Sequence, residues 1–158
     1  MQNLPNTVKL PNNTRFATRI AAAEFKVSSK GNNMIVLDLE TFNPESVTIN
    51  GVEYNVAGLK HKHYLTLTDA AMSRVKEFLK HIGLGGVELD KENPNTEQFI
   101  GRKFSALWSG KEYVYRAEVT EEERLAGKTQ GDPVQDEDGN AIKGYRPEMV
   151  LVVGPTKL

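Results

Sequence analysis

The sequence predicts a mainly β domain in which five long strands curve into a small barrel and one helix separates the third strand from the fourth. Segments in which apolar and polar residues alternate with period two fill most of the chain. One segment alone, residues 71–82, repeats its apolar residues at the three- and four-residue spacing of a helix. The length of 158 residues suits a single domain with one core.

The first two strands are predicted at residues 15–27 and 34–42. In the first, the apolar positions change parity once near Ala22, which predicts a β-bulge that bends the strand. Residues 28–33 are rich in Ser, Gly and Asn and form a turn. The second strand has the clearest alternation in the chain and ends at Asn43-Pro44.

A short hairpin, the third strand and the helix follow in that order. Asn50-Gly51 supplies the positive φ angles of a two-residue type I′ turn between short strands. Residues 59–67 alternate, so that lysines and a tyrosine share one face and histidines and leucines share the other. The helix begins at Thr68 or Asp69, which can accept its first amide hydrogens, and ends at Gly83.

The last third of the chain contains two more strands and a long insertion. Residues 99–108 and 111–119 read as a second hairpin around Ser109-Gly110. Residues 120–147 are a polar, acidic loop insertion whose Asp138-Gly139 pair indicates a small hairpin. Residues 149–153 form a short strand that closes the sheet.

Three strands, a helix and two strands are the order of the oligonucleotide/oligosaccharide-binding (OB) barrel, in which a helix joins the third strand to the fourth. The predicted class is therefore an OB-fold-like five-stranded barrel with inserted hairpins. An SH3-like barrel and an irregular α+β sandwich also fit the pattern. Residues 1–14 are predicted to be an N-terminal arm, and residues 15–158 a single OB-like domain.

The charges are unevenly distributed although the net charge is only −1. Acidic residues crowd into residues 88–97 and 120–140, whereas Lys and Arg lie in the predicted strands and turns. A near-neutral total thus conceals a positive face. The chain has no cysteine, no secretion signal at its start and no apolar stretch of membrane-spanning length, so we expect a cytoplasmic protein.

Basic and aromatic residues are interleaved on the predicted strands, and this combination suits single-stranded nucleic acid. Flat rings stack on bases and cations follow phosphates, without regard to sequence. The pattern leaves open whether Trp108 and the tyrosines are core residues or groove residues. The predicted nucleic-acid-binding residues are Lys30, Lys60, Lys62, Tyr64, Arg102, Lys103, Trp108, Lys111, Tyr113, Tyr115 and Arg116.

The sequence offers little for metal binding or catalysis. His61 and His63 share one strand face, but no third ligand accompanies them, so packed histidines are the better interpretation. Asp136, Asp138 and Asn140 resemble the start of a calcium loop, yet its glycine is misplaced. No phosphate-binding glycine loop, serine elbow or cysteine nucleophile occurs, so we expect no enzyme and no cofactor, although a nuclease site of scattered carboxylates stays open.

Residues 26–40, with the sequence KVSSKGNNMIVLDLE, resemble the first strand-turn-strand of phage-encoded OB-fold proteins of the single-stranded-DNA-binding type. Residues 65–69 (LTLTD) and 78–84 (FLKHIGL) are similar in kind to that group, as is the Asp- and Asn-rich stretch 89–94 after the helix. The likeness covers roughly residues 15–108. It implies a role in phage DNA replication or recombination.

These observations together predict a non-enzymatic, largely sequence-independent single-stranded-DNA-binding protein, in the host cytoplasm if it is phage-encoded. The acidic loop is expected to contact replication or recombination proteins, and no membrane partner is expected. The residues leave open whether RNA is also bound and whether the chain forms homo-oligomers. The alternative prediction is a small β-barrel structural or assembly protein of a virus particle.

Overall fold

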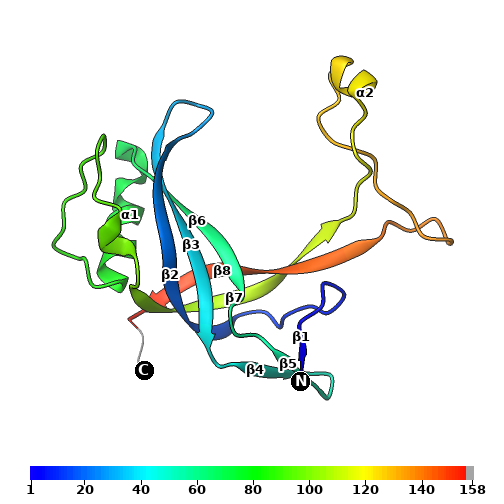
Figure 1. Ribbon diagram of the computed structural model, residues 1–158, viewed down its shortest axis with the longest axis horizontal. Helices are drawn as coiled ribbons and strands as arrows, with labels where there is room; N and C mark the ends of the chain where they lie inside the picture. The colour runs from blue at the N-terminus through cyan, green and yellow to red at the C-terminus, as the bar shows by residue number, and fades with distance from the viewer. Residues whose placement is uncertain (156–158) are drawn as a thin grey trace.

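A five-stranded antiparallel sheet in the order β6-β3-β2-β7-β8 forms the body of the protein, as the computed structural model shows for residues 1–155 (Figure 1). The strands are β2 (Thr14–Val27), β3 (Asn33–Asn43), β6 (Lys60–Thr66), β7 (Lys103–Val114) and β8 (Lys143–Gly154). The prediction of a mainly β domain is confirmed.

Strand β2 connects the two halves of this sheet. Its first part pairs with β7, from Thr14 to Arg19, and most of its length pairs with β3. The register between β2 and β3 shifts between Ile20 and Ala22, which confirms the predicted bulge and bends the strand. The bend lets one strand contribute to two sides of a curved sheet, with Phe16 and Ile20 fully buried inside it.

A second, three-stranded sheet lies at one end of the body and has the order β1-β5-β4. Its strands are β1 (Gln2–Asn3), β4 (Ser46–Ile49) and β5 (Val52–Asn55). The turn between β4 and β5 has Asn50 at φ 50° and Gly51 at φ 80°, which confirms the predicted hairpin.

The single long helical segment comprises a 3₁₀ turn at Asp69–Ala71 and α1 (Met72–His81). The hydroxyl of Thr68 accepts a hydrogen bond from the Ala71 amide, as the sequence predicts for the helix start. Val75, Phe78 and Leu79 are buried against the strands. A short 3₁₀ helix, η2 (Glu97–Phe99), follows and buries Phe99 in the same core. No helix within residues 1–155 is long and apolar enough to cross a membrane.

The prediction of a hairpin around Ser109-Gly110 is wrong, because β7 runs through both residues as one continuous strand. Gly110 is instead the place where the N-terminal segment crosses the sheet. Its amide donates to the carbonyl of Leu10 at 3.1 Å, and a Cβ on Gly110 would lie 2.7 Å from the Leu10 nitrogen. Leu10 itself is only 1% exposed, so this part of the N-terminal segment packs on the body, whereas Met1 is 75% exposed.

The last strand is also longer than predicted, since β8 begins at Lys143 and not at 149. Its first residues pair with the end of β7, up to Val114 opposite Lys143. The two strands run together away from the body and carry residues 115–142, hereafter the insertion (Figure 1). The insertion contains α2 (Glu121–Leu125), which has no buried residue, and a small turn closed by the Asp136 amide and the Asn140 carbonyl.

Candidate nucleic-acid interface

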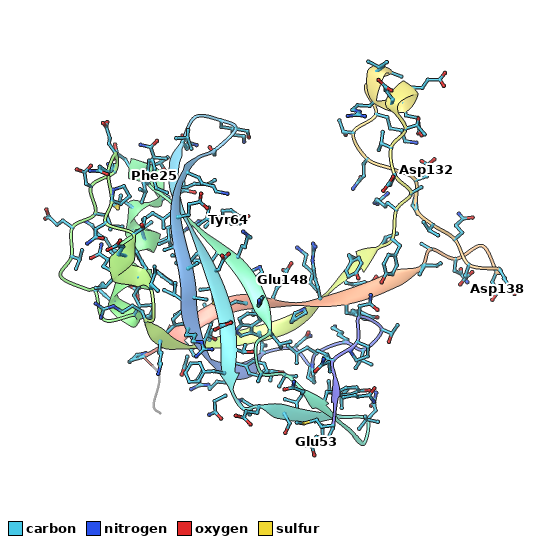
Figure 2. The ribbon with its side chains drawn as sticks, in the orientation of Figure 1. Phe25, Glu53, Tyr64, Asp132, Asp138 and Glu148 are labelled. Carbon is cyan, nitrogen blue, oxygen red and sulfur yellow. The ribbon has the colours of Figure 1, made fainter. Side chains whose placement is uncertain are left out.

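A groove of about 730 Å³ lies between β3 and β6 on one side and β8 on the other. Strands β6 and β8 are the two edges of the five-stranded sheet, and the curvature of the sheet brings them near each other. Figure 2 shows Tyr64 and Glu148 on the side of the body that faces the insertion. The groove is lined by Ala21, Asp38, Leu39, Glu40, Lys60, His61, Lys62, Tyr64, Arg146, Pro147 and Glu148.

Strand β6 supplies the aromatic surface and two of the cations. Successive side chains of a strand point to opposite faces, so that Lys60, Lys62 and Tyr64 are exposed while Leu65 is buried. The Tyr64 side chain is 54% exposed, so much of its ring is open to solvent. A flat ring next to two ammonium groups is the combination that binds a base and its phosphates.

Carboxylates alternate with these cations, so the groove is not uniformly positive. Lys62 Nζ lies 3.4 Å from Asp38 Oδ1, and Arg146 Nε lies 3.4 Å from Glu148 Oε1. Lys60 has no carboxylate within salt-bridge distance among the described residues. Because exposed ion pairs contribute little to stability, a phosphate can replace a carboxylate as the partner of either cation.

Residue Glu40 illustrates the same pairing on β3. Its carboxylate accepts a 2.5 Å hydrogen bond from Arg19 Nε, and it stands opposite Lys60 in the β3–β6 register. The row Arg19–Glu40–Lys60 therefore crosses three strands with two cations and one carboxylate. The row has a net positive charge, and two of its members, Glu40 and Lys60, line the groove.

The two histidines of β6 are neutral packing residues and not groove cations. Burial lowers the pKa of His61, and the nearby Arg146 and Lys111 lower it too, while Glu148 acts in the opposite direction. Burial also lowers the pKa of His63, whose ring packs 5.1 Å from that of Phe78. Among residues 1–155, no group of three His, Asp or Glu side chains is arranged to hold a metal ion.

Trp108 lies in the core, and the prediction that it binds nucleic acid is corrected accordingly. Its side chain is 0% exposed, and its indole N–H donates to the Thr18 hydroxyl at 3.1 Å. Rings of Phe16 and His61 pack edge-on against it at 6.4 and 6.0 Å. A ring enclosed in this way has no free face for a base.

Tyr113 and Tyr115 lie where β7 leaves the body, outside the groove. Their rings are 5.2 Å apart at 71°, and the Tyr113 hydroxyl donates to that of Tyr115. The guanidinium of Arg146 lies 5.6 Å from the centre of the Tyr113 ring. Gly144 packs directly on this ring, since a Cβ there would lie 2.7 Å from it. Both tyrosines are half-buried and brace the ribbon formed by β7 and β8.

Three other predicted cations lie outside the groove lining, one beside the groove, one in a turn and one on strand β7. Lys111 Nζ is 3.8 Å from Glu148, beside the groove. Lys30 is exposed in the turn between β2 and β3. Lys103 is exposed on β7 and covers the ring of Phe42 at 5.4 Å.

Two other predicted cations have structural partners. Arg102 donates to the carbonyl of Gln98 at 3.0 Å and is half-buried. Arg116 donates to the carbonyl of Gly131 at 3.1 Å, inside the insertion. Of the eleven predicted residues, the groove thus brings together Lys60, Lys62 and Tyr64.

Sequence reasoning missed the β8 wall of the groove, namely Arg146, Pro147 and Glu148. Proline lacks the amide that a strand interior needs, so Pro147 argued against a strand at that position. The one signal for a strand was Tyr145, since tyrosine is enriched in strands.

No protein-family model and no curated protein matches this chain.

Proposed function

We propose that this protein binds single-stranded DNA in the groove between β6 and β8, largely without regard to sequence, and acts in phage DNA replication or recombination. The observation that carries the proposal is the exposed ring of Tyr64 beside Lys60 and Lys62 on the wall of a 730 Å³ groove. Binding of this kind is not catalysis, and it requires no cofactor.

The strand order supports an OB-fold assignment, which we propose as the finer description of the fold. Strands β2, β3 and β6 form a meander, β7 returns beside β2, and α1 precedes β7, as in the OB barrel. The groove then lies on the second and third strands of that barrel, β3 and β6. In OB folds, these two strands and the loop that corresponds to the turn 28–32 bind oligonucleotides.

Base stacking on Tyr64 contributes about 1–3 kcal/mol per stacked base to the proposed binding energy. Lys60, Lys62 and Arg146 then hold the flanking phosphates. The interleaved carboxylates keep the groove nearly neutral, so it attracts a rigid, highly charged duplex only weakly. A flexible single strand is favoured, because it can place its bases on the Tyr64 ring.

The test is fluorescence anisotropy with labelled oligo-dT and a labelled duplex of equal length. We expect saturable binding of oligo-dT that is stronger than binding of the duplex, and similar affinities for oligo-dT and for mixed-sequence oligonucleotides. Absence of oligo-dT binding at low salt would overturn the proposal. Intact substrate after incubation with Mg²⁺ is expected, because the proposed activity is binding alone.

A second candidate is a structural or assembly protein of a virus particle, and the projecting insertion is the observation that favours it. The insertion projects from the body, and Leu125 on its helix α2 is 83% exposed (Figure 1). Size-exclusion chromatography with and without oligo-dT separates the two candidates. A shift only with DNA supports the first, and concentration-dependent assembly without DNA supports the second.

A further inference from the structure

The two walls of the groove belong to strands that are not joined by a backbone ladder. Among residues 1–155, β6 pairs only with β3, and β8 pairs only with β7. One side chain bridges this gap instead, since the Met149 amide donates to Nδ1 of His61 at 3.3 Å. The hydrogen bond connects β6 to β8 in the place where a ladder would close the sheet.

Packing holds both partners of this hydrogen bond, His61 and Met149, in place. Its ring packs edge-on against the buried Trp108 at 6.0 Å and 70°. Met149, only 8% exposed, belongs to the core and directly follows Glu148 in the groove wall. The spacing between Lys60 and Lys62 on one wall and Glu148 on the other therefore depends on the His61–Met149 contact.

We propose that His61 is the positioning residue of the groove: its neutral imidazole holds the β8 wall against the β6 wall, and protonation releases it. Neutral imidazole has one acceptor nitrogen, and here it is Nδ1, so the proton is on Nε2. Imidazolium has two donors and no acceptor. Protonation thus places the Nδ1–H of His61 against the N–H of Met149, so the hydrogen bond between the two strands is lost.

The pKa of His61 in the folded protein determines the pH at which this hydrogen bond is lost. Its pKa lies below 6.5, chiefly because of burial, so that the ring is neutral at pH 7. The unfolded chain takes up the proton more readily than the folded one. The contact contributes its full stability above pH 6.5, and it is lost as the pH falls through the lowered pKa of His61 in the folded protein. The titratable or charged groups on the surrounding elements are Glu148 and Arg146 on β8, Lys111 on β7, His63, Lys60 and Lys62 on β6, and Asp38 and Glu40 on β3.

The experiment is amide hydrogen exchange at Met149, measured by NMR between pH 5 and 8 and corrected for the intrinsic exchange rate. In the wild type, the ring signals of His61 report its protonation. As His61 becomes protonated, protection of the Met149 amide should fall by about fivefold, which corresponds to the loss of one hydrogen bond. His61→Asn retains an acceptor close to the position of Nδ1 but does not titrate, so its protection should not depend on pH. His61→Leu has no acceptor, so at every pH its Met149 amide should show the lower protection of the protonated wild type.

His81→Asn is the matched control, because His81 lies on α1 away from the groove and should leave the wild-type pH profile unchanged. Unchanged protection of the Met149 amide in wild type once His61 is protonated would overturn the proposal. If His61→Leu does not fold, the profiles of the wild type and His61→Asn decide the question.

This inference rests on the proposed function in one respect: loss of the His61–Met149 hydrogen bond should weaken the affinity for oligo-dT. Hydrogen exchange requires no DNA. A pH-dependent Met149 amide in a protein that does not bind oligo-dT would support the link and refute the proposed function. A pH-independent amide in a protein that binds oligo-dT would do the reverse.

Discussion

Tyr64 is the side chain on which the proposed base stacking in the groove depends. It is the aromatic residue of the groove lining with a large exposed surface, at 54%. Its neighbours along β6, Lys62 and His63, are a cation and a packed neutral ring, so no second ring on this strand can replace it.

Replacing Tyr64 with alanine should weaken oligo-dT binding by about 5- to 150-fold, the equivalent of about 1–3 kcal/mol for one stacked base. Tyr64→Phe keeps the ring and should bind nearly as the wild type does. Anisotropy titrations measure both, with circular dichroism as the control for folding. Wild-type affinity in Tyr64→Ala would place the binding surface elsewhere.

Trp108 should behave as a core residue. Trp108→Phe removes a buried hydrogen bond to Thr18 and part of the core volume, so we expect a loss of about 2 kcal/mol in the free energy of unfolding. Urea denaturation measures this loss. Oligo-dT affinity of the folded variant should stay unchanged, and a large loss of affinity without a loss of stability would contradict its core position.

Tyr64 and Trp108 show what sequence reasoning can predict about single residues. Alternation along a strand predicts which side chains share a face, and it correctly put Lys60, Lys62 and Tyr64 together. It does not say which face is covered by the rest of the chain. Trp108 shares a face with Phe104 and Ala106, as predicted, but that face is the inside of the sheet.

At the scale of elements, strand β7 shows why glycine is an ambiguous signal. Ser109-Gly110 has the composition of a turn, yet Gly110 lies within a strand because the backbone of Leu10 passes against it. This contact joins residues a hundred positions apart in the sequence and leaves no local trace. The first half of β8 was also not predicted, because Pro147 argued against a strand there.

Gly110→Ala tests this interpretation of β7. The new Cβ would lie 2.7 Å from the Leu10 nitrogen, so the N-terminal segment must move, at a cost of about 1–3 kcal/mol in the free energy of unfolding. Gly86→Ala is the matched control, since a Cβ at Gly86 has no neighbour within 4 Å and its φ is not positive. Equal urea midpoints for the two variants would refute the close approach.

The whole molecule has a separation of charge that the net value of −1 conceals. The insertion, residues 115–142, contains eight Asp and Glu residues and three Lys and Arg residues. The rest of the chain contains 13 Asp and Glu residues and 17 Lys and Arg residues. Figure 2 shows Asp132 and Asp138 far out on this projection, away from Tyr64. The body is thus positive and the projection negative, as the sequence indicates in outline.

Deleting the insertion should strengthen oligo-dT binding at low salt. Val114 and Lys143 are paired across β7 and β8, so an Asn-Gly turn can join them without disturbing the body. The deletion removes five net negative charges, which reduces repulsion of the DNA, and the gain should disappear at high salt. Anisotropy at two salt concentrations measures it, and loss of binding would show instead that the insertion contacts the DNA.

The salt dependence of oligo-dT affinity tests the central claim most directly. If Lys60, Lys62 and Arg146 each neutralise one phosphate, the logarithm of the binding constant should fall with the logarithm of salt concentration at a slope of about −2. The double variant Lys60→Gln/Lys62→Gln should reduce the slope to about −0.7, while Lys76→Gln on α1 leaves it unchanged. A slope near zero in the wild type, or the same slope in the double variant, would contradict the account.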